Sequence, residues 1–102
     1  PASFTWTVDT TPPVIRNVQA SSITRSSAII SWKTNEPADT QVEYGTTTSF
    51  GQSTTLNTNL VTSHAQSLTG LLAKTTYYYR VKSRDAVENP AVSPTFKFRT
   101  QR

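Results

Sequence analysis

The chain has 102 residues, which suits one domain, and only 34% of them are apolar, so the expected core is thin. Its net charge of +4 comes from basic residues spread along the chain, which does not favour a nucleic-acid partner. It has no cysteine, which excludes disulfides, thiolate metal sites and a thiol nucleophile.

The N-terminal segment differs from the rest of the chain. Three large apolar residues alternate with threonine there: Phe4, Trp6 and Val8. Such side chains need burial, either as the last strand of a preceding domain or against an edge of this domain. Pro12 and Pro13 then hold the chain extended and mark a boundary. We therefore expect an extension or interdomain linker over residues 1–12 and one domain over residues 13–102.

Seven segments are typical of β-strands, because β-branched and aromatic residues recur at every second position between turn-forming residues. In chain order they are Ile15–Ile23, Ala28–Lys33, Thr40–Tyr44, a short edge strand within residues 46–59, Ser63–Leu68, Tyr77–Arg84 and Thr95–Thr100. The cluster Asn35–Asp39 is expected to be a turn, and Pro94 should interrupt pairing. No helical period separates the segments, so the pattern predicts an all-β, seven-stranded antiparallel sandwich.

The strand period of two also predicts which side chains form the core. The inward-facing residues should be Ala28, Ile30, Trp32, Val42, Tyr44, Leu68, Tyr77, Tyr79, Val81, Phe96 and Phe98, with Leu71 at the corner before the sixth strand. Trp32 should be the largest single element of this core.

Three features together resemble the fibronectin type III domain: Trp32 late in the second strand, Tyr77 six residues after Leu71, and a terminal Phe-x-Phe. The resemblance covers about residues 13–100 and implies an immunoglobulin-like sandwich of fibronectin type III topology. It also implies that Trp32 fills the core and that the Tyr77 hydroxyl turns back onto the backbone, as a tyrosine corner.

Four motifs, Val42–Thr46, Ser63–His64, Leu68–Leu71 and Thr76–Val81, are similar to a bacterial subgroup and to the sandwich that precedes the catalytic domain of purple acid phosphatases. This resemblance implies a secreted or cell-surface, multidomain protein in which the chain is an accessory module beside a polysaccharide-degrading domain. Its implied partners are the neighbouring domains, and the isolated module is expected to be a monomer.

The chain departs from that family at two places. It has Ala73 and Lys74 where proline and glycine are usual, and Gln66 where an apolar residue is usual. Because lysine disfavours the left-handed conformation, we expect a different turn at the corner. Gln66 should lie at a wetter end of the core. No Arg-Gly-Asp triplet occurs, so integrin binding is not implied.

No constellation for catalysis is visible. His64 is the sole histidine, and we expect it to be buried or at an edge with a hydrogen bond rather than a ligand. Asp39 and Glu43 share strand parity but should form a surface pair rather than a glycosidase dyad. One loop holds oxygen donors that calcium could use, namely Asp85, Glu88 and Asn89, although an ordinary polar turn is favoured. We expect no enzyme activity, no catalytic residue, no metal and no cofactor.

One surface has the composition of a ligand site. The outer face of one sheet should carry Tyr78, Arg80, Lys82, Lys97 and Arg99. An exposed tyrosine among cations suits a sugar ring or an acidic polysaccharide. The alternative is a solvated face on which Gln41 and Glu43 pair with the cations.

These observations leave three hypotheses for function. The leading one is a spacer module, the second a carbohydrate-binding module, and the third protein recognition or adhesion through the polar stretch Thr46–Asn59. The apolar runs are far shorter than the roughly 20 residues that a membrane-spanning helix needs.

Overall fold

The computed structural model describes residues 12–102, which form seven strands and no helix. In chain order the strands are β1 (Ile15–Ser21), β2 (Ala28–Gly45), β3 (Gln52–Ser53), β4 (Asn57–Leu68), β5 (Thr76–Arg84), β6 (Pro90–Val92) and β7 (Phe96–Arg99). The predicted all-β fold is confirmed. Phe4, Trp6 and Val8 lie outside the described part of the chain. Residues 12–102 contain no helix that is long and apolar enough to cross a membrane.

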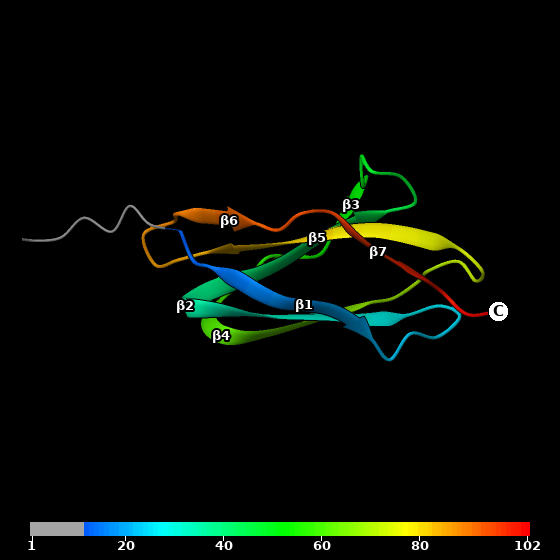
Figure 1. The fold of residues 1–102 in the computed structure, drawn as a ribbon, viewed down its shortest axis with the longest axis horizontal. Coiled ribbons are helices and arrows are strands. Elements are labelled where there is room, and N and C mark those ends of the chain that lie inside the picture. Colours follow the sequence, from blue (N-terminus) through cyan, green and yellow to red (C-terminus); the bar gives the residue numbers. More distant parts are fainter. Residues whose placement is uncertain (1–11) are drawn as a thin grey trace, which may run out of the picture.

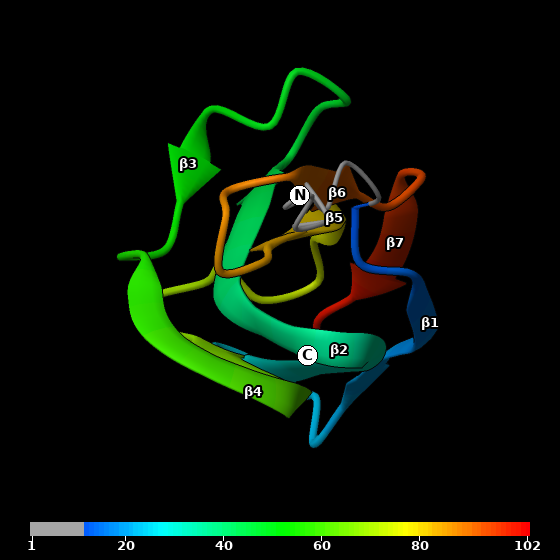
Figure 2. The ribbon, with the colours of Figure 1, turned by 90° about the vertical axis from the view of Figure 1, so that its left-hand side faces the viewer.

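The strands form two layers that pack face to face (Figure 1). The first layer contains β1, the first half of β2 and β4, with β2 in the centre. The second layer contains the end of β2 together with β3, β5, β6 and β7, and β5 pairs with three of them. Every pairing is antiparallel, and the view along the sandwich shows how β2 bends from one layer into the other (Figure 2).

The bend of β2 corrects the prediction at Asn35–Asp39. We expected a turn between two strands, but β2 is a single strand of 18 residues that runs through this cluster. Its register with β4 shifts between Lys33 and Ala38 and again between Ala38 and Thr40. Pro37 lies within the first shift, where its missing N–H costs no ladder hydrogen bond. The polar cluster therefore bends the strand without ending it.

The last predicted strand, Thr95–Thr100, is β7, and a short strand that was not predicted, β6, precedes it across an interruption; both pair with β5. Pro94 lies in the interruption, as the sequence predicted. Ser93 maintains the connection there, because its backbone N–H donates to the Val81 carbonyl (3.0 Å) and its Oγ accepts from the Val81 N–H (2.9 Å). The long β4 also corrects the prediction, since it begins at Asn57 rather than Ser63.

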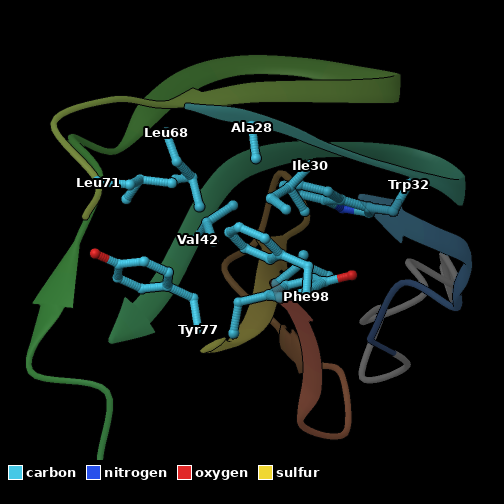
Figure 3. Packing of buried hydrophobic residues seen from close by; sticks show 10 residues of the cluster. Ala28, Ile30, Trp32, Val42, Leu68, Leu71, Tyr77 and Phe98 are labelled. Atoms are coloured by element: carbon cyan, nitrogen blue, oxygen red, sulfur yellow. The ribbon is translucent and has the colours of Figure 1, made fainter. Parts of the chain in front are cut away.

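The core lies between the layers and follows the predicted alternation (Figure 3). Its buried members are Ala28, Ile30, Trp32, Val42, Leu68, Leu71, Tyr77, Tyr79, Val81 and Phe98. Tyr44 is half-buried against this cluster. Phe96 is the exception, because it remains 36% exposed at the rim and covers Tyr79 with a ring separation of 5.8 Å. Phe96 is the first residue of β7 and lies on the side of the sandwich between β1 and the β6–β7 segment, which we call the open side.

The tyrosine corner is present as expected. The Leu72 N–H donates to the Tyr77 hydroxyl at 2.8 Å. The prediction for Lys74 was wrong, because it does take the left-handed conformation, with φ of 55°. Its N–H donates to the Gln101 carbonyl at 3.0 Å, a bond that helps to offset the strain of a non-glycine residue there. Gln66 is half-buried, as expected for a wetter end of the core.

Candidate functional site

The outer cationic face, defined by Tyr78, Arg80, Lys82, Lys97 and Arg99, lies on the solvent side of the second layer. Strand β5 alternates strictly, with Tyr77, Tyr79, Val81 and Ser83 buried and the residues between them half-exposed. In the register of β5 with β7, Tyr78 lies opposite Lys97 and Thr76 lies opposite Arg99. The five predicted residues therefore share one face, as the period of two requires.

Glu43 neutralises the centre of the outer cationic face. Its carboxylate accepts from Arg80 Nε at 2.5 Å and lies 3.9 Å from Lys82 Nζ. The Arg80 guanidinium also lies 4.9 Å from the centre of the Phe50 ring, a cation–π distance. Gln41 does not join these pairs, because its side-chain amide donates to the Thr54 carbonyl instead. Of the two residues expected to pair with the cations, only Glu43 does so, and its ion pair holds Arg80 in place.

Lys97 and Arg99 form the part of this face that keeps its charge. Both are exposed, and no carboxylate among residues 12–102 lies within 4.0 Å of either side chain. Tyr78 lies directly across from Lys97. Tyr78 and these two unpaired cations are the only portion of the face, within the described residues, that could meet an anionic ligand without first breaking an ion pair.

A second ion pair, which sequence reasoning missed, lies beside the outer cationic face. Asp39 is only 5% exposed, so it is not half of a surface pair with Glu43. Its carboxylate accepts from the Arg84 backbone N–H at 2.6 Å and from Arg84 Nε at 3.0 Å. Nothing local in the sequence links these two residues, which are 45 positions apart. Asp39 and Glu43 of β2 are thus each neutralised by an arginine of β5.

His64 belongs to the core and not to a surface site. It is 3% exposed, and its ring stacks on Trp32 with 5.0 Å between centres and 3° between planes. Both ring nitrogens are hydrogen-bonded, Nε2 to the Thr34 hydroxyl at 3.0 Å and Nδ1 to the Thr40 hydroxyl at 2.7 Å. Burial lowers the pKa of His64, and the nearby Asp39 carboxylate opposes that shift. The imidazole has no lone pair to offer a ligand.

The loop after β5 has the hydrogen bonds of an ordinary polar turn. Asp85 Oδ1 accepts from the Val87 and Asn89 N–H groups at 3.0 and 2.9 Å, and Asp85 Oδ2 accepts from the Asn89 side-chain amide at 3.0 Å. Glu88 lies 3.6 Å from Arg84. Across residues 12–102 no group of three or more histidine and acidic side chains is placed to hold a metal ion.

The two-layer fold, the buried tryptophan and the tyrosine corner define a fibronectin type III-like β-sandwich. Residues 13–100 match the family described as the purple acid phosphatase N-terminal domain, and the chain belongs to that family. A comparison with curated protein sequences gave no significant match.

Solved structures share this fold. The chain resembles one described as a myokine structure, with 20% identity, a TM-score of 0.75 and coverage of 90% of this chain and 100% of that one. It also resembles the third fibronectin III domain of the human KIAA0343 protein, with 17% identity, a TM-score of 0.64 and coverage of 99% and 94%. A structure of PhoD matches with 17% identity and a TM-score of 0.62, over 81% of this chain but only 18% of PhoD. At these identities the likeness shows the fold alone.

Proposed function

We propose that this chain is a non-catalytic spacer that holds neighbouring domains of one polypeptide in a fixed relation. The parent protein on this proposal is a secreted or cell-surface bacterial multidomain protein, such as a polysaccharide-degrading hydrolase. The family to which the chain belongs is described by its place at the N-terminus of an enzyme, and the small share of PhoD that it matches fits a module of a larger protein.

The observation that carries the proposal is the way in which the chain leaves the sandwich. Strand β1 begins at one end of the sandwich and the C-terminus lies at the other (Figure 1). Gln101 is held by three hydrogen bonds: its N–H donates to the Thr24 carbonyl (3.1 Å), its side-chain amide to the Ile23 carbonyl (2.9 Å), and its carbonyl accepts from the Lys74 N–H (3.0 Å). The direction in which a following domain would leave is therefore fixed by two loops.

A distance measurement tests the spacer. The chain has no cysteine, so spin labels can be placed at Val14→Cys and Arg102→Cys without a background signal. Both positions are exposed. We expect a narrow distance distribution that Gln101→Gly broadens. Thr48→Gly, at an exposed position in the loop after β2 that makes none of the Gln101 hydrogen bonds, should leave it narrow. A broad distribution in the unsubstituted chain would refute a rigid exit. In the parent protein, deletion of the module should alter the stability of the protein or the distance between its remaining domains. The isolated module should bind no glycan.

A second function, binding of an acidic polysaccharide by the outer cationic face, is favoured by one observation. Lys97 and Arg99 carry no ion pair within residues 12–102, and Lys97 lies opposite Tyr78. The double variant Lys97→Ala/Arg99→Ala should abolish retardation of the chain in affinity gels that contain polygalacturonate. The control Arg25→Ala/Lys33→Ala removes the same charge from exposed positions outside this face. If both variants lost retardation equally, the binding would depend on net charge alone and not on the outer cationic face.

A further inference from the structure

A groove of the described chain lies along the open side of the sandwich, between β1 and the β6–β7 segment. Its volume is about 560 Å³, and its lining includes Pro12, Pro13, Ile15, Val18, Val92 and Phe96. Figure 2 shows β1 and β7 on the same side of the two layers. Val92 and Phe96 remain 46% and 36% exposed there. Large apolar side chains left in water along one groove are typical of a docking surface.

The two borders of this groove suit an extended segment. Within the described residues, β1 pairs only with β2, and β6 and β7 pair only with β5. The outer edges of both layers are therefore unpaired along the groove. An extended peptide can add to such an edge through its backbone and place every second side chain into an apolar floor. The occupant should consequently alternate large apolar and small polar residues.

We propose that this groove receives residues 4–8 of the same chain. That segment, Phe-Thr-Trp-Thr-Val, has the required alternation, and it lies outside the described part of the chain. Pro12 and Pro13 themselves line the groove, so the chain that precedes them starts at its mouth. Three residues, Asp9 to Thr11, separate the segment from Pro12, which gives roughly 10 Å of extended chain for a reversal. Aspartate and threonine favour such a turn.

Charge supports the same occupant. Asp9 is the sole charged side chain in residues 1–11, and Arg16 lines the groove. Arg16 has no ion pair within residues 12–102. Of the two partners that the alternating residues could have, the geometry thus points to this domain's own open side rather than a preceding domain. This inference goes beyond the spacer function and does not depend on it.

Trp6 provides the test. The chain has two tryptophans, and Trp32 is buried, so subtracting the spectrum of Trp6→Phe from that of the whole chain isolates the emission of Trp6. We expect this emission to be shifted to shorter wavelength than in a free peptide of residues 1–11, with acrylamide quenching several-fold weaker. Equal emission and quenching in the chain and the peptide would overturn the proposal.

Two variants locate the contact. Val92→Asp places a charge in the groove and should restore peptide-like quenching of Trp6. Val87→Asp, at a position that is 61% exposed in the neighbouring loop, should leave the quenching weak. Equal quenching in the two variants would overturn the assignment to the groove. Protection of Trp6 that increases with protein concentration would also overturn it, since the segment would then dock on a second copy.

Discussion

The contact of His64 with the bend of β2 leads to a prediction about pH. Thr34 and Thr40 lie on either side of the bend, and the imidazole joins them. The Thr34 hydroxyl already donates to the Glu36 carbonyl at 2.8 Å, so it must accept from Nε2–H. Nδ1 then accepts from the Thr40 hydroxyl. The hydrogen bonds therefore select the neutral imidazole with its proton on Nε2, and a second proton on Nδ1 would meet a hydroxyl that is donating.

The sign of the pH dependence follows from the lowered pKa of His64. Burial disfavours the charged imidazole, and the Asp39 carboxylate offsets only part of this effect. As the pH falls below the ordinary value of 6.5, the unfolded chain takes up a proton that the native chain does not. The contribution of His64 to the free energy of unfolding is therefore full above 6.5 and declines as the pH falls toward the lowered pKa.

Urea unfolding at pH values on both sides of 6.5 checks this prediction. His64→Ala should cost roughly 2–5 kcal/mol at neutral pH, the usual range when a large buried side chain is truncated. It should also remove the decline of stability that begins near pH 6.5. Thr40→Val is the matched control, because it leaves Nδ1 without a donor at a cost of about 1–3 kcal/mol but keeps the titrating group. If His64→Ala retained the same pH dependence as the unsubstituted chain, our account of the imidazole would be wrong.

Three further substitutions test single contacts through the midpoint of urea unfolding. Tyr77→Phe removes the hydroxyl that accepts a backbone N–H of the corner, and should cost about 0.5–1.5 kcal/mol. Ser83→Ala leaves the Trp32 indole N–H, which now donates at 2.9 Å, without an acceptor in the core, and should cost about 1–3 kcal/mol. Gly45→Ala places a Cβ onto the backbone carbonyl of Phe50, and should cost about 1–3 kcal/mol or displace that loop. Midpoints that do not change would contradict each assigned contact.

The sequence predicted well what depends on the alternation of a single strand. The buried residues of β5 and the inward set Ala28, Ile30 and Trp32 are all where a period of two placed them. This succeeds because the direction of a strand side chain is a local property of the backbone. The tyrosine corner was predicted from the resemblance to the fibronectin type III domain, whose motif Leu71 and Tyr77 match.

What the sequence did not predict depends on contacts between distant residues. The composition of Asn35–Asp39 is typical of a turn, yet the segment continues as a strand. Two partners from elsewhere in the chain hold it: Arg84 binds the Asp39 carboxylate, and His64 binds a threonine on each side. A local propensity that favours a turn is weak compared with several buried hydrogen bonds. No spacing in the sequence reveals that these partners meet.

The same separation between local and distant effects bears on where the module can bind. Alternation predicted five residues on one outer face, but the register of β2 with β5 places Glu43 opposite Arg80, and that pair satisfies the centre of the face. The open side of the sandwich, in contrast, was not predicted, because no sequence motif marked it and Phe96 was expected inside the core. Within the described residues, no strand pairs with the outer edges of β1, β6 and β7, and the side chains of Val92 and Phe96 remain exposed there. Burial of apolar surface yields more free energy than an exposed ion pair does, so the open side is the stronger docking surface.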